Sequence, residues 1–146
     1  ETALADDFVA GVVGWLDVDS PAAIRELDKY QELPGANYLK GIRDIVQDHP
    51  DPNYLARPQV NETIKELGKR GLVFDILTKT PELPGAIELV KKNPDVQFVL
   101  DHISKPYISK NEFERSPRLI VSSTHIERKW KFFTRSHFYI CLHPFN

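Results

Sequence analysis

Residues 98–106 read Phe-Val-Leu-Asp-His-Ile-Ser-Lys-Pro, an apolar run that stops abruptly at an aspartate and a histidine. Three further apolar runs end in the same way, at Asp17, at Arg43 and at Asp75. Buried parallel strands are typically short apolar runs, and in a β/α barrel their carboxyl ends bring reactive groups to one shared mouth. The pattern therefore predicts barrel strands that carry chemistry at one end.

Segments with helical spacing alternate with these runs. Apolar residues recur at helical spacing over residues 24–30, and at i, i+4 and i+7 over residues 60–67 and 83–90. We interpret Ser20-Pro21 as an N-cap followed by a first-turn proline. Successive strands start about 25 to 33 residues apart, as βα units require. The predicted strands are Phe8–Leu16, Leu39–Val46, Leu72–Leu77 and Val96–Leu100.

Two architectures fit alternating strands and helices. One is a β/α barrel and the other is a flavodoxin-like sheet. A flavodoxin-like sheet is disfavoured because Gly11 and Gly14 lie inside the first predicted strand and no Gly-x-Gly-x-x-Gly phosphate loop follows any strand. A complete barrel needs about 200 to 250 residues, whereas this chain has 146. The sequence therefore predicts an α/β fold, an incomplete TIM (β/α)8 barrel.

The composition changes sharply near Glu114. Residues 1–114 contain 13 Lys and Arg against 20 Asp and Glu, whereas residues 115–146 contain 6 against 1. All seven glycines lie before Glu114. We predict a partial barrel over residues 1–114, followed over residues 115–146 by a divergent basic tail, unrelated to the barrel or irregular, which is disordered or mis-joined.

The bulk properties are those of an ordinary globular protein. The formal net charge of −2 gives no general reason to expect nucleic acid or an anionic membrane as a partner. No apolar run approaches the roughly 20 residues of a membrane span. Cys141 is the only cysteine, so the chain cannot form an internal disulfide, and we expect a cytoplasmic location.

Three ionisable residues at strand ends are the main candidates for chemistry. The imidazole of His102 suits a zinc ligand or a general base near neutral pH, and the alternative is a histidine hydrogen-bonded to a loop carbonyl. The guanidinium of Arg43 can hold a carboxylate or a lactone carbonyl, and its alternative is an ion pair with Asp44, Asp48 or Asp75. Asp75 itself is a candidate ligand, a base or a partner of that arginine. Asp101 alternates to the face opposite His102, so we expect it to orient the histidine ring or to pair with a helix.

Two further residues are candidates for substrate binding. Trp15 precedes the end of the first strand and can form a wall against a substrate, although a tryptophan there more often belongs to a core. Lys105 stands just before Pro106 and can neutralise an anion at the mouth, although a solvated lysine is the simpler interpretation.

Six segments at or just after the strand ends, taken in order, resemble one known family: Gly-Trp-Leu-Asp at 14–17, Gly-Ile-Arg at 41–43, Gln-Asp-His-Pro-Asp-Pro at 47–52, Phe-Asp-Ile-Leu at 74–77, Leu-Pro at 83–84 and residues 98–106. They are similar to the amidohydrolase-related family of metal-dependent hydrolases on TIM barrels, in its sugar-lactonase and pyrone-dicarboxylate hydrolase branch. The resemblance covers about residues 8–114 and corresponds to barrel strands three to six.

The resemblance implies hydrolysis of a lactone or related cyclic ester by attack of water on the ring carbonyl. It implies a divalent metal, zinc first, in the complete family member, with His102 as a metal ligand or carbonyl-polarising group and Arg43 facing the substrate. The family's His-x-His pair belongs to the first strand and its aspartate base to the eighth. Neither is recognisable in this sequence, so we expect a fragment that is inactive alone and holds a metal only as part of the complete protein.

A second function class stays open beside the hydrolase. A non-catalytic half barrel could bind a partner through the basic residues of the tail, where cations alternate with aromatic side chains over residues 129–135. For the hydrolase, the expected partner is a small lactone or carboxylate, with neither nucleic acid nor membrane involved. An open half barrel also exposes strand edges, which predicts self-association.

Overall fold

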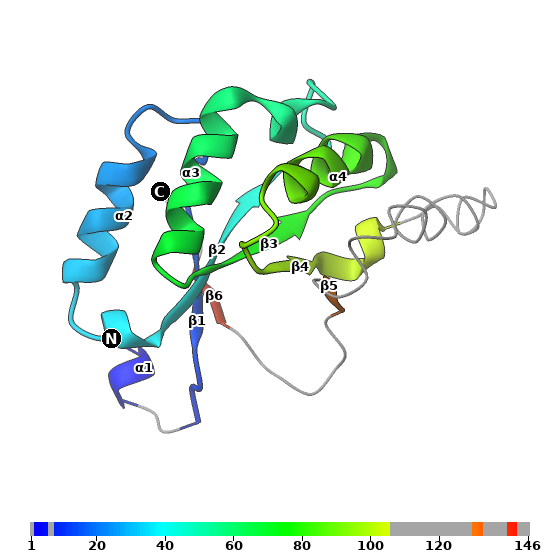
Figure 1. Ribbon diagram of the computed structural model, residues 1–146. Coiled ribbons are helices and arrows are strands. Elements are labelled where there is room, and N and C mark those ends of the chain that lie inside the picture. The colour runs from blue at the N-terminus through cyan, green and yellow to red at the C-terminus, as the bar shows by residue number, and fades with distance from the viewer. Residues whose placement is uncertain (1, 6–7, 106–129, 133–139, 143–146) are drawn as a thin grey trace.

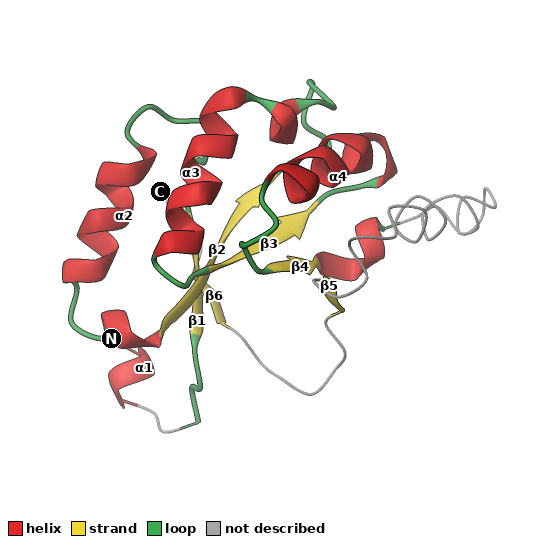
Figure 2. Cartoon of the chain, in the orientation of Figure 1, coloured by secondary structure: helices red, strands yellow, loops and turns green. Residues whose placement is uncertain are grey.

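The computed structural model describes residues 2–5, 8–105, 130–132 and 140–142. Within these ranges the strands form one parallel sheet in the order β5-β4-β3-β2-β1-β6 (Figures 1 and 2). The strands are β1 (Val12–Trp15), β2 (Leu39–Ile45), β3 (Val73–Leu77), β4 (Phe98–Leu100), β5 (Trp130–Phe132) and β6 (Ile140–Leu142).

Helices α2, α3 and α4 cover one face of this sheet (Figure 1). Each follows a strand and precedes the next parallel one, so β1 to β4 form consecutive βα units. The helices are α1 (Thr2–Ala5), α2 (Ala23–Glu32), α3 (Pro58–Lys69) and α4 (Leu83–Lys92), and the 3-10 turns are η1 (Ala36–Tyr38), η2 (Tyr54–Ala56), η3 (Thr80–Glu82) and η4 (Asp101–Ser104).

The core lies between the sheet and these three helices. Apolar residues at alternate positions of β2, β3 and β4 are buried and pack on the apolar sides of the helices. Burying a large apolar side chain stabilises a fold by about 1.5 to 3 kcal/mol, so this layer supplies most of the driving force. The strand members of the core are Ile42, Phe74, Ile76, Phe98 and Leu100, and the helix members include Leu27, Ile64, Leu67, Leu83 and Leu89.

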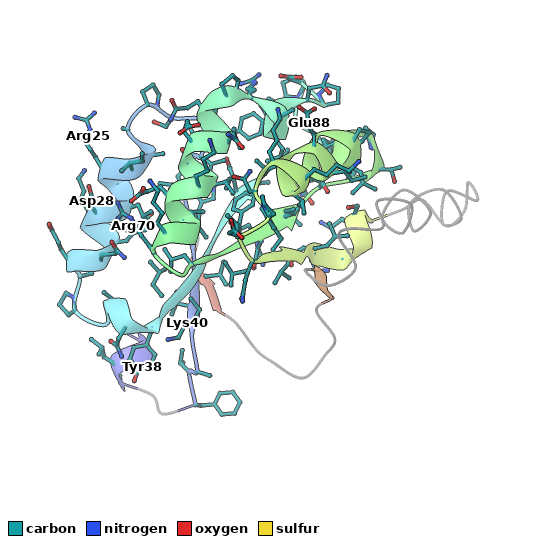
Figure 3. All side chains as sticks on the ribbon, in the orientation of Figure 1. Arg25, Asp28, Tyr38, Lys40, Arg70 and Glu88 are labelled. Carbon is teal, nitrogen blue, oxygen red and sulfur yellow. The ribbon has the colours of Figure 1, made fainter. Side chains whose placement is uncertain are left out.

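Local sequence explains where α3 begins and ends. Pro58 occupies the first turn, where a missing N–H costs nothing. Gly71, just past the end of the helix, adopts a φ of 69°, a left-handed conformation that glycine accepts without strain. On the outer surface Arg70 forms an ion pair of 2.7 Å with Asp28 of α2 (both labelled in Figure 3), which ties the two neighbouring helices together.

The predicted strands and helices of residues 8–100 are confirmed in type and order. One local prediction is wrong, because α2 begins at Ala23 with Ala22 as its N-cap, and Ser20-Pro21 lies outside the helix. The Ser20 hydroxyl accepts a hydrogen bond of 3.1 Å from the Ala22 N–H in the turn that leads into the helix. A serine two residues too early stabilises that turn instead of the helix itself.

Two short strands come from the region that was predicted to be a tail. β5 pairs with β4 and β6 pairs with β1, so these segments form the two edges of the sheet. The boundary at residue 114 and self-association through strand edges stay predictions. Among the described residues, no helix has both the length and the apolar character needed to cross a membrane.

Candidate active site

One face of the sheet carries a row of four side chains from four neighbouring strands. Trp15 is in register with Arg43, Arg43 with Asp75, and Asp75 with Val99. Their sequence neighbours Ile42, Phe74 and Leu100 belong to the core under the helices. Since successive side chains of a strand alternate between faces, the row lies on the face opposite α2, α3 and α4, which we call the inner face.

Arg43 lies between two buried carboxylates on the inner face. Its Nη2 donates a hydrogen bond to Asp75 Oδ2 at 3.4 Å. The same nitrogen lies 2.9 Å from Asp101 Oδ2, and this contact is an ion pair without a hydrogen bond. The Asp75 and Asp101 side chains are 9% and 6% exposed, against 21% for Arg43. The buried Nε of Arg43 has no acceptor among the described residues. We call Arg43, Asp75 and Asp101 the arginine triad.

Burial dominates the electrostatics of the triad. It raises the pKa of Asp75 to about 6, assisted by the neighbouring Asp101 charge and opposed by Arg43. Burial likewise raises the pKa of Asp101, against the nearby positive charges of Arg43, His102 and Lys105. Asp75 can therefore exchange a proton close to neutral pH, which is a property expected of a general acid or base.

His102 lies in η4, immediately after β4, and is exposed. Its φ is 50°, and Ser104 and Lys105 also have positive φ values of 55° and 44°. Strained backbone of this kind persists only where the surroundings hold it, and it gathers at functional sites. Here the buried Ser104 hydroxyl lies 3.0 Å from the Thr78 hydroxyl, which fixes η4 against the end of β3.

Two lysines form the rim beside the triad. Lys105 donates to the side-chain oxygen of Gln47, and Lys79 donates to both carboxylate oxygens of Asp48 at 2.6 Å. These contacts join the segments that follow β2, β3 and β4, the carboxyl ends where parallel strands place their functional groups. The prediction that Lys105 lies at the mouth agrees with this position, although substrate binding itself stays a prediction.

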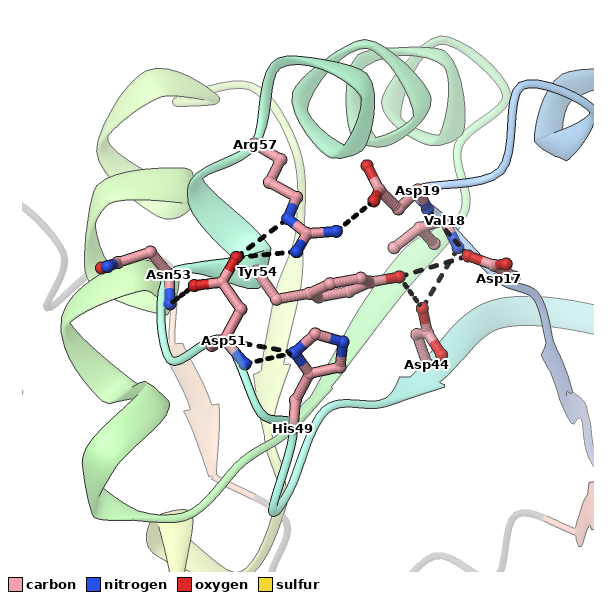
Figure 4. A network of polar contacts seen from close by, with 9 residues as sticks. All are labelled: Asp17, Val18, Asp19, Asp44, His49, Asp51, Asn53, Tyr54 and Arg57. Carbon is pink, nitrogen blue, oxygen red and sulfur yellow. Dashed lines mark hydrogen bonds and ion pairs between the residues drawn. The ribbon is translucent and has the colours of Figure 1, made fainter.

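A second polar network lies on the helix side of the same strand ends (Figure 4). Tyr54, in η2, donates to Asp44 Oδ2 at 2.7 Å and lies 3.2 Å from Asp17 Oδ1. Asp44 also accepts the backbone N–H groups of Val18 at 3.1 Å and Ile45 at 2.8 Å. Burial raises the pKa of Asp44, and the hydrogen bonds from Tyr54 and the backbone oppose that rise.

Arg57 continues this network outward (Figure 4). Its guanidinium binds Asp51 Oδ2 at 2.7 and 3.0 Å and Asp19 Oδ2 at 2.5 Å, and it lies over the Tyr54 ring at 5.0 Å. The His49 ring nitrogen Nδ1 lies 3.0 Å from the Asp51 backbone. The network thereby fastens the segment after β1 to the loop after β2.

The structure brings some of the predicted residues together and separates others. Trp15, Arg43 and Asp75 share the inner-face row, and the alternative prediction of an Arg43–Asp75 ion pair is confirmed. His102 lies at the mouth, outside that row. In the described ranges, no three His, Cys, Asp or Glu side chains are grouped so that they could hold a metal ion.

Sequence reasoning missed the part played by Asp101. We expected it to orient the His102 ring or to pair with a helix, and it pairs with Arg43 instead. Strand alternation could have indicated this pairing. Val99 is in register with Asp75, and Asp101, two residues beyond Val99, is expected on the same face of the sheet.

Comparison with known proteins agrees with the fold. A family model described as amidohydrolase matches residues 2–138. The chain is 31% identical over 117 residues to L-fucono-1,5-lactonase of Burkholderia ambifaria, covering 78% of this chain and 38% of the relative. It is 32% identical over 115 residues to the uncharacterised protein y4mH of Sinorhizobium fredii, covering 73% and 38%. The chain therefore spans about two fifths of the length of the curated relatives it matches.

Solved structures show the same architecture. An amidohydrolase from Burkholderia multivorans with bound zinc superposes with a TM-score of 0.70 and 22% identity, over 89% of this chain and 45% of that one. A second crystal form of it, with bound HEPES, gives 0.71 and 20% identity over 89% and 46%. These matches confirm the prediction of an incomplete barrel, and the family resemblance seen in the strand ends is confirmed as well. The chain belongs to the amidohydrolase family.

Proposed function

We propose that this chain forms part of a hydrolase that opens a lactone or related cyclic ester by attack of water on the ring carbonyl. The observation that carries the proposal is the arginine triad, which places a guanidinium and an aspartate of raised pKa side by side on the inner face. Membership of the amidohydrolase family and similarity to an L-fucono-1,5-lactonase support this reaction class.

The proposed roles follow from the position of each group. Arg43 N–H groups would bind the ring carbonyl oxygen and stabilise the negative charge that develops on it when water adds. Asp75, with a pKa of about 6, would accept a proton from the attacking water. Trp15, next to Arg43 in the row, would form one wall for the ring, and Lys105 would bind a polar group of the substrate at the mouth.

His102 is the proposed metal ligand or additional base. Its exposed imidazole has the chemistry of a zinc ligand, but the described residues group no set of three ligands around it. The described residues thus do not by themselves fit a zinc ion, and the proposed roles of Arg43 and Asp75 need side chains alone. A divalent metal, zinc first, is proposed for the complete protein, in keeping with the zinc bound by the related amidohydrolase structure.

We further propose that the chain is a fragment and is inactive by itself, since it spans about two fifths of its curated relatives. We also propose a location in the cytoplasm and a small lactone or carboxylate as the substrate. The rival function is a non-catalytic binding module that uses residues 115–146 on a partner.

The test begins with the intact mass of the native gene product, combined with a lactone hydrolysis assay on that product. We expect a product about twice the length of this chain, as a complete barrel requires. It should hydrolyse L-fucono-1,5-lactone, whereas the 146-residue chain should not exceed the buffer rate. In the longer product, Arg43→Met should lower kcat/KM about a hundredfold or more, because an oxyanion donor is lost. A native product that ends at Asn146, or a longer one without lactone hydrolysis, would refute the proposal.

A further inference from the structure

The chain turns left-handed directly after β4, and this turn decides where His102 lies. Phe98 and Leu100 belong to the core on the helix side of the sheet. Because side chains alternate along a strand, His102 would follow them onto that side if β4 continued by two residues. Instead η4 begins at Asp101, and His102 adopts a φ of 50° with its side chain exposed. The turn therefore keeps the imidazole out of the core and leaves it at the mouth.

This conformation is unfavourable for the residues that adopt it. His102, Ser104 and Lys105 have positive φ values of 50°, 55° and 44°, and none of them is a glycine. Left-handed backbone is disfavoured in such residues because the Cβ atom crowds the following carbonyl oxygen. Backbone of this kind persists only where surrounding contacts hold it. A contact between η4 and its surroundings must therefore offset the strain.

The most deeply buried polar contact of η4 in the described ranges is a pair of hydroxyl groups. Ser104 Oγ lies 3.0 Å from Thr78 Oγ1, and both side chains are fully buried. Removing either hydroxyl leaves the other buried without this partner, which costs free energy. Thr78 is itself fixed on both sides. The Leu77 carbonyl accepts the backbone N–H groups of two residues that follow β2, and the Lys79 N–H donates to the buried Glu82 carboxylate at 2.8 Å.

We propose that Thr78 and Ser104 are positioning residues for His102, because their hydroxyl pair holds η4 in the left-handed conformation that keeps the imidazole at the mouth. The inference rests on the proposed function, in which His102 takes part in hydrolysis, and it adds two residues that act only through that histidine. It makes no use of the net charge of the mouth. It therefore applies equally to a histidine that acts as a ligand and to one that acts as a base.

Hydroxyl variants of the 146-residue chain test the backbone part of the inference, with EDTA present and no substrate. In a left-handed residue the amide and α protons lie closer together than in other conformations, so the NOE between them reports the backbone of His102. Thr78→Val and Ser104→Ala should each weaken this NOE, whereas Thr78→Ser retains the hydroxyl and should preserve it. Thr63→Val is the matched control, because Thr63 is equally buried but donates within α3, to the Gln59 carbonyl.

Substitution by glycine separates positioning from a general loss of stability. Ser104→Gly lacks the hydroxyl as Ser104→Ala does, but glycine adopts the left-handed conformation without strain. If the hydroxyl serves to hold this conformation, Ser104→Gly should keep the His102 NOE better than Ser104→Ala. If the hydroxyl only stabilises the fold, Ser104→Gly should be no better than Ser104→Ala, and the inference fails.

The catalytic part is measured on the longer native product, assayed with L-fucono-1,5-lactone. Thr78→Val and Ser104→Ala should lower kcat about tenfold or more and change KM by about twofold at most, because a misplaced group slows the chemical step. Thr78→Ser and Ser104→Gly should recover most of the lost kcat. Thr63→Val should retain the kcat of the wild type.

The two readouts keep the inference and the proposed function apart. An unchanged His102 NOE in both Thr78→Val and Ser104→Ala would overturn the inference, and so would a wild-type kcat in both. If one of these variants loses its dispersed amide spectrum, the other decides. A native product without lactone hydrolysis would refute the proposed function, and the NOE would still decide whether the hydroxyl pair sets the backbone of His102.

Discussion

Removing one hydroxyl group from Tyr54 should destabilise the fold more than removing the same group from Tyr30. Both hydroxyls donate a hydrogen bond of 2.7 Å, but Tyr54 donates to the buried Asp44 carboxylate and Tyr30 to the backbone carbonyl of Trp15. Hydrogen bonds to charged groups contribute roughly 1.5 to 3 kcal/mol, whereas those between neutral groups contribute about 0.5 to 1.5 kcal/mol. We therefore expect Tyr54→Phe to cost about 2 kcal/mol and Tyr30→Phe about 1 kcal/mol.

Urea-induced unfolding at pH 7.5, followed by circular dichroism, measures both free energies of unfolding. Because the Tyr54 hydroxyl stabilises the charged form of Asp44, its loss should raise the pKa of that carboxyl further. The stability gap between wild type and Tyr54→Phe should consequently shrink as the pH falls and Asp44 takes up a proton.

Two outcomes would refute this reasoning. The first is a Tyr54→Phe cost no larger than that of Tyr30→Phe at pH 7.5, because the charge of Asp44 would then contribute nothing. The second is a stability gap that stays constant from pH 7.5 down to the acid limit of the fold. As a control, the wild type, Tyr54→Phe and Tyr30→Phe should have equal urea m-values, which would show that unfolding exposes a comparable surface in all three.

Three further changes probe the inner face and the sheet. Arg43→Met leaves two buried carboxylates unpaired and should cost about 3 kcal/mol or more in urea unfolding at pH 7.5, with a smaller cost at pH 5. Since the folded-state pKa of Asp75 is about 6 against 3.8 unfolded, its contribution to stability declines as the pH rises through this window. Asp75→Asn should therefore remove a fall in stability of roughly 2 kcal/mol between pH 4 and pH 7, and an unaltered pH profile would contradict the raised pKa of Asp75. Gly41→Ala would set its Cβ 2.8 Å from the Val73 backbone oxygen. Its melting temperature should drop well below that of Gly14→Ala, whose new Cβ would meet only the ends of side chains, the nearest at 3.3 Å.

The order of strands and helices could be predicted because each apolar run marks one buried element. Over residues 8–100 every predicted strand and helix occurs, with the largest difference at the first strand, which begins at Val12 instead of Phe8. The flanking residues of that strand are also apolar, and periodicity cannot tell where backbone pairing stops. The pairing of Trp130–Phe132 and Ile140–Leu142 with the sheet could not be predicted, since a three-residue strand has no periodicity of its own.

The candidate site was predictable one residue at a time but not as a cluster. Arg43 and Asp75 could be placed at neighbouring strand ends, and their mutual ion pair was one stated alternative. The Tyr54–Asp44 hydrogen bond depends on how η2 folds back over the end of β2, which no local pattern in the sequence specifies. Likewise, the sharing of one guanidinium by two aspartates depends on distances between strands.

Strand alternation explains why two adjacent residues at the end of β2 take part in different polar networks. Arg43 and Asp44 are adjacent in sequence, yet they lie on opposite faces of the sheet and join different networks. On the helix side, Asp44 accepts the Tyr54 hydroxyl and the Val18 N–H, so it holds two loops in place. On the inner face, Arg43 contacts Asp75 and Asp101 through Nη2. Because the side-chain contacts of Arg43 and those of Asp44 share no partner among the described residues, loss of loop order on one side and loss of the proposed ligand recognition on the other should be separable by single substitutions.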